Sequence, residues 1–539
     1  MRHTMMPYEL TLTSIFNRAR ALYSSVEVVT RLPDKSIRRR TFAEFDVRAR
    51  KLASALRRAG LKKGDRVATL SWNHDVHLEA YFGIPISGCV LHTLNLRLHP
   101  DDIGFVAGHA DDRFVIVDDV LVPLYEKFRR AIPNLAKTIV VPLTGASVPE
   151  GAVNYEAFLE TGDATEPLPE LSENDVMGMC YTSGTTGKSK GVAYSHRTMA
   201  LHSLAAGLAD TLAISRNDTV LPVVPMFHAN AWGIPFAAVM VGAKLVMPGP
   251  HLDAVSLLDL FEQERVTLAA GVPTIWLGIL EALEREPTRW KLQPGLRMVV
   301  GGSAAPESMI RAFDRHGLRV VHAWGMTETA PLGSVSHVPP ELANSSDDDK
   351  YAARAKQGIP SPFIEVRAVG DGGEVPRDGL TPGELEVRGA WVAGSYHELE
   401  SEGERWTADG WFKTGDVVTI DARGCLKITD RTKDLIKSGG EWISSVDLEN
   451  ALMGHPAVKE ACVVAVPHPK WAERPLAAVV LKEGKSATTD ELRAFIASKF
   501  AKFWVPDDVV FVEAIPKTSA GKFLKSALRE QFKNFAPVG

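Results

Sequence analysis

The sequence is poor in cysteine and contains no long hydrophobic run. Four cysteines, Cys89, Cys180, Cys425 and Cys462, are spread over 539 residues. They form no C-x-x-C pair or other metal-ligand spacing, which argues against a disulfide scaffold or a zinc ribbon and fits a reducing compartment. No apolar run reaches the roughly 18 residues that a membrane span requires, and the first residues lack the apolar core of a secretory signal. We therefore expect a soluble, cytoplasmic protein with no transmembrane segment.

The sequence also lacks an excess of basic charge. Its 61 Lys and Arg residues are outnumbered by 66 Asp and Glu residues, which gives a formal net charge of -5. This balance argues against a general nucleic-acid binder, so we expect no nucleic-acid partner. Hydrophobic residues make up 45% and charged residues 24% of the chain, as in ordinary globular proteins. The chain is too long for a single hydrophobic core, so two or more domains are expected.

Hydrophobic periodicity predicts an α/β architecture for the first part of the chain. Residues 45–59 have helical spacing, residues 66–71 read as a strand, and the alternation continues to about Gly358. Such alternation is typical of largely parallel sheets. Further strands are expected at 113–117, 192–194, 243–247, 296–300 and 319–322, and further helices at 77–83, 255–264 and 274–285.

The pattern changes after Gly358. Short segments and glycine-rich turns up to Asp430 predict antiparallel sheet or a small barrel. Beyond Asp430, helices at 445–453 and 490–499 and strands at 458–466 and 477–481 predict small α/β units. We place a boundary between Asp430 and Arg431, which gives domains 1–430 and 431–539. The acidic stretch 341–350 is expected to be an exposed loop.

The strongest chemical signal is the segment YTSGTTGKSKGV at residues 181–192. Glycine lets backbone N–H groups approach phosphate oxygens, hydroxyl groups add hydrogen bonds, and lysine supplies positive charge. A Walker A loop would require glycine at the position of Thr182, so that alternative fails. A strand rather than a helix is also expected after Gly191. The alternative is that this segment is a flexible Ser/Gly turn that binds no ligand.

This segment resembles the phosphate loop of the adenylate-forming superfamily, which includes acyl-CoA synthetases, firefly luciferase and peptide-synthetase adenylation domains. The usual proline of that loop is Ser189 here. Seven further segments resemble the family's other motifs, in the same order along the chain. The first four resemble the motif at the acyl site (225–232), the motif beside adenine (301–306), the core motif (324–329, with tryptophan for the commoner tyrosine) and the motif at the ribose (414–416). The last three resemble the hinge (430–434), the thioester loop (437–443) and the motif near the C-terminus (516–522).

The resemblance implies a fold and a set of residue roles. The fold is α/β, with a large N-terminal domain of two α/β subdomains and a small β-barrel, followed by a small mobile α+β C-terminal domain. The residues implied to bind ATP or AMP are Thr182, Ser183, Gly184, Thr185, Thr186, Gly187, Lys190, Gly302, Ser303, Ala304, His322, Ala323, Trp324, Gly325, Met326, Thr327, Asp416, Arg431, Lys433 and Lys522.

Smaller sets are implied for the other roles. Mg²⁺ would be held by Thr185 and Glu328, and Asp430 would be the hinge. The acyl pocket would contain His228, Trp232, Val299 and Pro331, and CoA would meet Lys437, Gly439, Gly440 and Trp442. The catalytic groups would be Lys522, His228, Thr186, Glu328 and Lys437. By residue type alone, Glu328 could be an ordinary surface carboxylate, and His228 and Trp232 could be core side chains.

The implied activity is that of an AMP-forming acid–CoA ligase, which uses ATP, Mg²⁺ and coenzyme A and passes through an acyl-adenylate. The segments around Trp232 and residues 269–276 resemble the medium- and long-chain fatty-acyl-CoA synthetase subgroup, which includes methylmercaptopropionate–CoA ligases. The resemblance implies a fatty acid or a short thioether acid such as 3-methylmercaptopropionate. Apolar pockets separate chain lengths by only ~1–3 kcal/mol per methylene, so the sequence does not specify the chain length. The alternatives are delivery to a carrier-protein thiol and luciferase-like oxygenation of the adenylate. A homodimer is expected.

Overall fold

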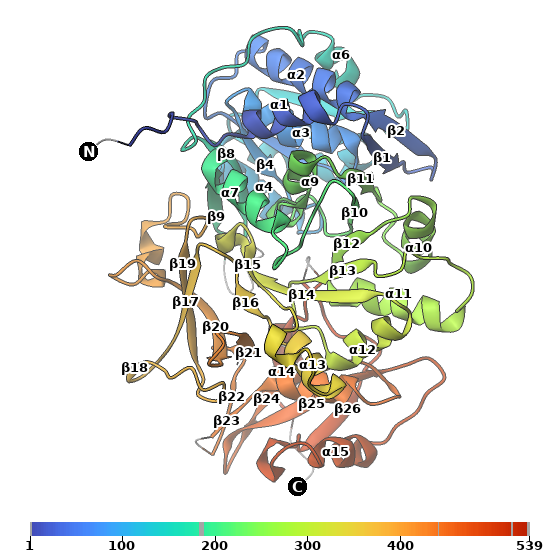
Figure 1. Cartoon of the computed structure of the whole chain (residues 1–539), viewed down its shortest axis with the longest axis vertical. Helices are drawn as coiled ribbons and strands as arrows, with labels where there is room; N and C mark the ends of the chain where they lie inside the picture. Colours follow the sequence, from blue (N-terminus) through green and yellow to red (C-terminus); the bar gives the residue numbers. More distant parts are fainter. Residues whose placement is uncertain (1–2, 183–187, 440, 519–520, 536–539) are drawn as a thin grey trace.

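Two largely parallel sheets form the first two thirds of the chain in the computed structural model, which describes residues 3–182, 188–439, 441–518 and 521–535 (Figure 1). The first sheet has seven strands, and only β8–β9 pair antiparallel. Its spatial order is β7 (Val153–Asn154), β6 (Lys137–Val141), β5 (Asp112–Asp118), β3 (Arg66–Leu70), β4 (Val90–Thr93), β8 (Val176–Tyr181) and β9 (Gly191–Ser195).

The second sheet has nine strands, and its antiparallel pairs lie at the two ends. The predicted α/β class is therefore confirmed. Strands such as β3 and β12 are buried along almost their whole length, as expected for sheets that are covered on both faces. The order is β16 (Ile359–Pro360), β15 (Leu332–Val335), β14 (Arg319–Gly325), β13 (Arg297–Val300), β12 (Leu268–Gly271), β10 (Thr219–Pro222), β11 (Lys244–Met247), β1 (Glu27–Arg31) and β2 (Ile37–Thr41).

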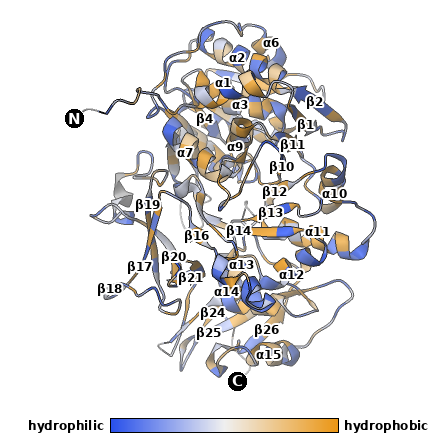
Figure 2. Ribbon diagram, in the orientation of Figure 1, coloured by the Kyte–Doolittle hydropathy of each residue, from blue (hydrophilic) through white to orange (hydrophobic). Residues whose placement is uncertain are grey.

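The helices of these two units differ in hydropathy according to their burial (Figure 2). Apolar α9 lies within the core, whereas acidic α13 lies at the surface. The main helices are α1 (Leu12–Leu22), α2 (Phe42–Arg58), α3 (Asp75–Ile86), α4 (Pro100–His109), α6 (Tyr155–Leu159), α7 (His196–Gly207), α9 (Ile234–Val241), α10 (Ala254–Gln263), α11 (Pro273–Arg285), α12 (Glu307–Arg315) and α13 (Asp347–Arg354).

The expected loop at 341–350 is helical in its second half. Ser346 caps α13 by accepting a hydrogen bond from the Asp349 amide, and three aspartates occupy the first turn of the helix. Negative charge at a helix N-terminus is favourable because the helix dipole is positive there. The segment is exposed, as expected, but the prediction of a loop throughout is wrong, because a helix begins at Asp347.

Antiparallel sheet follows, as the sequence predicts after Gly358. Its strands are β18 (Gly373–Glu374), β17 (Ile364–Gly370), β19 (Gly383–Gly389), β20 (Phe412–Ile420) and β21 (Leu426–Arg431), in that spatial order. The C-terminal part has its own sheet of β23 (Glu441–Ile443), β22 (Ile436–Ser438), β25 (Ala472–Leu481), β24 (Val458–His468) and β26 (Asp508–Phe511), covered by α14 (Ser445–Met453), α15 (Thr489–Ala497) and α16 (Lys525–Gln531). The domain boundary and the mobility of this part stay predictions.

The part of the chain that the structure describes contains no helix long and apolar enough to cross a membrane. All four cysteines are free, and three of them are buried.

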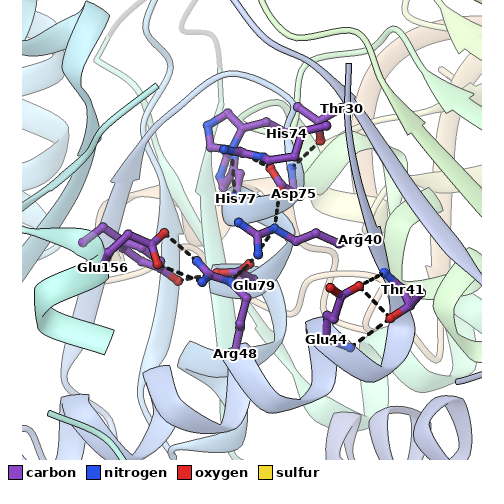
Figure 3. Close-up of polar contacts among 12 residues, drawn as sticks. Thr30, Arg40, Thr41, Glu44, Arg48, His74, Asp75, His77, Glu79 and Glu156 are labelled. Atoms are coloured by element: carbon purple, nitrogen blue, oxygen red, sulfur yellow. Dashed lines mark hydrogen bonds and ion pairs between the residues drawn. The ribbon is translucent and has the colours of Figure 1, made fainter. Parts of the chain in front are cut away.

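A buried ion-pair network joins α2, α3 and α6 (Figure 3). Arg48 of α2 lies 2.6 Å from Glu79 of α3 and 2.7 Å from Glu156 of α6. Glu79 is fully buried and also accepts a hydrogen bond from the Tyr155 hydroxyl at 2.9 Å. Burial raises the pKa of Glu79, and the nearby guanidinium of Arg48 opposes that shift. Arg48 therefore compensates a carboxylate that cannot reach water.

Replacing Arg48 with methionine should destabilise the fold by about 3 kcal/mol, because the buried Glu79 carboxylate then keeps only Arg40, 3.9 Å away, as a charged partner. The matched control is Lys51→Met on the same helix, which removes an exposed pair with Glu160 and should cost less than about 1 kcal/mol. Urea denaturation of both variants checks this. Equal losses would contradict the role assigned to Arg48.

Candidate functional site

A cavity of about 1090 Å³ lies where the two large sheets, the antiparallel sheet and the C-terminal part meet. Several of its walls are formed just beyond the carboxyl ends of parallel strands β8, β13 and β14, where open α/β sheets place their ligand sites. It is lined by these predicted site residues: Thr182, Lys190, His228, Trp232, Val299, Gly302, Ala323, Trp324, Gly325, Met326, Thr327, Glu328, Pro331, Arg431, Lys433 and Lys522. The motifs therefore converge, as their resemblance implies.

Lys522 enters this cavity from the C-terminal part of the chain. A Cβ on Gly302 would lie 3.2 Å from Lys522 Cε, so glycine provides the room for the lysine stem. Gly302 also has a φ of +84°, which side chains rarely adopt. Burial lowers the pKa of Lys522 to about 8, and the Arg431 charge adds to this shift, while the Asp416 and Glu328 carboxylates oppose it. The lysine is therefore mostly charged at neutral pH, and the field of two carboxylates favours that charge.

Asp416, predicted to bind ribose, is buried and oriented by two neighbours. Trp324 donates its indole N–H to Asp416 Oδ2 at 2.9 Å, and Arg431 Nε lies 3.3 Å from Oδ1. Thr414 Oγ1 accepts the Asp416 backbone N–H at 3.1 Å. The tryptophan that replaces the commoner tyrosine therefore has a function of its own here, because its N–H fixes the carboxylate.

Glu328 is the described residue that was predicted to hold Mg²⁺. It is buried, and its Oε1 accepts a hydrogen bond from the Tyr396 hydroxyl at 2.6 Å, while Tyr194 donates to the neighbouring Thr327 carbonyl at 2.7 Å. Within the described ranges, no group of three His, Cys, Asp or Glu side chains could hold a metal. One hard carboxylate beside a phosphate site fits Mg²⁺, because this ion takes most of its ligands from phosphates and water.

His228 and Trp232 bracket a left-handed turn beside the cavity. Residues 229–233 all have φ between +41° and +69°, although only Gly233 is a glycine. The Trp232 ring lies against Gly301, where a Cβ would stand 3.0 Å from Trp232 Cη2. Burial lowers the pKa of His228 to about 3, and the charges of Lys522 and Arg97 add to the shift. His228 is therefore neutral at physiological pH and can donate or accept a hydrogen bond.

A second cavity of about 200 Å³ adjoins the first on the side of β14 and the C-terminal part. Its lining includes the remaining described residues predicted beside the nucleotide, Ser303, Ala304, His322 and Asp416. His322 Nδ1 lies 3.1 Å from the Ala355 carbonyl oxygen, and burial lowers its pKa to about 4. His322 is therefore a neutral donor to the backbone.

Six predicted residues fall outside the described ranges: Ser183, Gly184, Thr185, Thr186, Gly187 and Gly440. The two ends of the phosphate segment are described. The Thr182 amide donates to the Lys190 carbonyl at 2.9 Å, and the Lys190 amide donates to Thr182 Oγ1 at 3.1 Å. The roles predicted for the six residues stay predictions.

The described residues among those predicted to meet CoA, namely Lys437, Gly439 and Trp442, line neither cavity. Trp442 is 48% exposed, and Lys437 Nζ lies 5.2 Å from the centre of its ring. The Gly439 amide donates to the Trp471 carbonyl at 2.9 Å. The structure therefore brings Lys522 into the cavity and leaves Lys437, Gly439 and Trp442 outside it.

Other lining residues had no signal in the sequence. Tyr396 orients Glu328, and Phe105, His109, Lys188 and Arg405 contribute further to the wall. His109 accepts or donates a 2.7 Å hydrogen bond with the Tyr181 hydroxyl. None of these residues except Lys188 lies in a glycine-rich motif, so only the folded chain reveals them.

Comparison with known proteins gives a consistent result. The AMP-binding enzyme profile matches residues 16–397, and the AMP-binding enzyme C-terminal domain profile matches residues 447–522. A long-chain-fatty-acid–CoA ligase from Thermus thermophilus is 50% identical over 99% of this chain and 97% of its own. A 3-methylmercaptopropionyl-CoA ligase from Ruegeria pomeroyi is 43% identical over 98% of each chain. The crystal structure of the anthranilate CoA ligase AuaEII with anthranoyl-AMP matches 99% of each chain with a TM-score of 0.87 at 24% identity.

The lowered pKa of Lys522 predicts a pH-dependent affinity for ATP. Lysine is charged below its pKa, so ATP should bind best below pH 8, and its affinity should fall about ten-fold by about pH 9.5 as this charge is lost. Isothermal titration calorimetry with Mg-ATP measures it. Lys522→Arg stays charged and should show no such fall. A parallel fall in wild type and Lys522→Met would assign the pH dependence to another group.

Proposed function

Because the chain belongs to the AMP-binding enzyme family, we propose that it joins a carboxylic acid to coenzyme A at the expense of ATP, which is split to AMP and pyrophosphate. The observation that carries this proposal is that Lys522 and Glu328 line one cavity with the apolar side chains of Trp232, Val299 and Pro331. Lys522 also lines the adjoining cavity, together with Asp416. Nucleotide-binding and apolar groups in one enclosed space suit an acid that reacts with a nucleotide.

The first step is attack of the acid's carboxylate oxygen on the α-phosphorus of ATP, with pyrophosphate leaving from the opposite side. The protein contributes position and charge. Lys522 offsets the negative charge that develops at the α-phosphate, and Asp416 accepts the ribose hydroxyls. Glu328, together with Thr185, would hold Mg²⁺, which supplies further charge neutralisation at the phosphates. The mixed anhydride that results is a far better acyl donor than the free acid.

The second step requires the thiol to reach the acyl carbon through space near Lys522. We infer that the C-terminal part rotates about Asp430, which withdraws Lys522 and brings Lys437, Gly439, Gly440 and Trp442 to the cavity. Hinges of this kind concentrate a large backbone change in a few residues. The exposed position of Trp442 supports this, because it leaves the residue free to form a new contact.

The acid is proposed to be apolar, either a fatty acid or a short thioether acid. The relatives named for long-chain fatty acids and for 3-methylmercaptopropionate share this chain's length and about half of its residues. Free coenzyme A is favoured over a carrier-protein thiol or oxygen because both relatives are named as CoA ligases. We also propose, from the sequence alone, that the protein forms a homodimer and is located in the cytoplasm.

The direct test is release of AMP that depends on coenzyme A, measured with ATP and Mg²⁺ across straight-chain acids from acetate to palmitate and 3-methylmercaptopropionate. Turnover that peaks on one acid supports the proposal and gives the length of the pocket. Pyrophosphate exchange without acyl-CoA formation would move the acceptor to a carrier protein or to oxygen. No exchange with any acid would overturn the proposal.

The two half-reactions should respond differently to changes in the thioester loop. Lys437→Ala and Trp442→Ala should leave pyrophosphate exchange within about two-fold, because both residues lie outside the cavity, and should slow transfer from acyl-adenylate to coenzyme A about ten-fold or more. Lys499→Ala, which removes another exposed lysine beside an aromatic ring, Phe495, is the matched control. Equal loss in both half-reactions would contradict the rotation.

A further inference from the structure

The side chain of Asp430 crosses from the antiparallel sheet to the C-terminal part. Asp430 lies in β21 and pairs with Val417 of β20, so its backbone belongs to the large domain. Its side chain is 1% exposed, and Oδ2 accepts hydrogen bonds from the Ser445 amide at 2.7 Å and the Ser445 hydroxyl at 2.6 Å. Ser445 is the first residue of α14. The carboxylate therefore binds the N-terminus of a helix in the other domain, where negative charge is favoured.

Lys525 joins this contact to the segment that carries Lys522. Its Nζ donates to Ser445 Oγ at 2.5 Å and lies 2.8 Å from Glu449 Oε1. Burial by itself would lower the pKa of Lys525, but the carboxylates of Glu449 and Asp430 raise it above its ordinary value. Lys525 begins α16, three residues after Lys522. One buried lysine thus connects the proposed hinge, α14 and the base of the segment that enters the cavity.

We propose that Lys525 and Ser445 are positioning residues for Lys522, forming with Asp430 a latch that stabilises the arrangement in which Lys522 occupies the cavity. This inference rests on the proposed two-step function. Rotation about Asp430 carries Ser445, Glu449 and Lys525 away together, because all three belong to the C-terminal part, and it breaks the bonds from Ser445 to the Asp430 carboxylate. Lys525 and Glu449 keep their pair through the rotation. The latch therefore stabilises one arrangement only.

Two ion pairs between the two domains are weaker candidates. Lys427 lies 3.0 Å from Asp447, and Lys459 lies 2.9 Å from Glu281. Lys427, Lys459 and Glu281 keep 39–46% of their side-chain surface exposed, and exposed pairs contribute little because water and salt screen them. The Asp430–Ser445 contact is buried, so its loss has the larger effect on the balance between arrangements.

The test compares two half-reactions in the full-length enzyme. Lys525→Met should slow ATP–pyrophosphate exchange at least ten-fold through kcat, and Ser445→Ala should slow it about three-fold. Both variants should convert preformed acyl-adenylate and coenzyme A to acyl-CoA within about two-fold of wild type. Lys525→Arg keeps a charged donor at this position and should restore most of the exchange rate. Lys459→Met, which removes an exposed pair across the same boundary, should leave both rates within about two-fold.

A purely structural role for Lys525 predicts a different result. Because Lys525→Met leaves Glu449 buried without its partner, Lys525→Met/Glu449→Gln provides a second variant in which no unpaired charge remains. The proposal expects this double variant to keep the selective loss of exchange. Equal loss of both half-reactions in the double variant, or undiminished exchange, would overturn the latch. If wild type itself gives no exchange with any acid, the proposed function fails instead, which separates the two outcomes.

Discussion

The site depends on one constraint: the charge of Lys522 must be held in a cavity where burial disfavours the charged form. Burial lowers the pKa of Lys522, and only nearby carboxylates keep the charged form accessible. Asp416 and Glu328 supply that field, and each is held by a neighbour, Trp324 in one case and Tyr396 in the other. The cation comes from the C-terminal part, whereas both carboxylates come from the large domain. A charge that enters from a separate domain can be withdrawn when a second reaction needs its place.

The wall of the cavity beside Lys522 contains a strained turn. Four consecutive non-glycine residues, 229–232, have left-handed backbone conformations, at a cost of roughly 1–2 kcal/mol each. Such a turn persists only where its surroundings determine it. Asn230 is fully buried, with Cys180 Sγ 3.3 Å from its Oδ1, and Trp232 is seated on Gly301. The strain therefore fixes Trp232 against the same glycine pair that makes room for Lys522.

The motifs could be recognised in the sequence because each is local, with its chemistry carried by a few adjacent residues, and their resemblance to one family implied that they share a site. Ser445–Met453 as a helix and Arg66–Leu70 as a strand followed from periodicity for the same reason. Contacts between distant residues could not be predicted. Tyr396 is 68 residues from Glu328, and Trp324 is 92 residues from Asp416. The left-handed turn also escaped prediction, because alanine and tryptophan do not favour that conformation and one asparagine does not indicate four left-handed residues in a row.

An enzyme that alternates between two arrangements requires them to be close in free energy. A strong preference for one arrangement would leave the other rarely populated and would slow its half-reaction. The chemistry around Asp430, the proposed hinge, suits this requirement. Burial raises the pKa of Asp430, so holding its carboxylate charged is costly, and the helix N-terminus and Lys525 offset that cost. A buried charge that is compensated in this way contributes little net stability, but its hydrogen bonds still require one relative position of the two partners. Asp430 can therefore define where the C-terminal part docks without holding it there permanently.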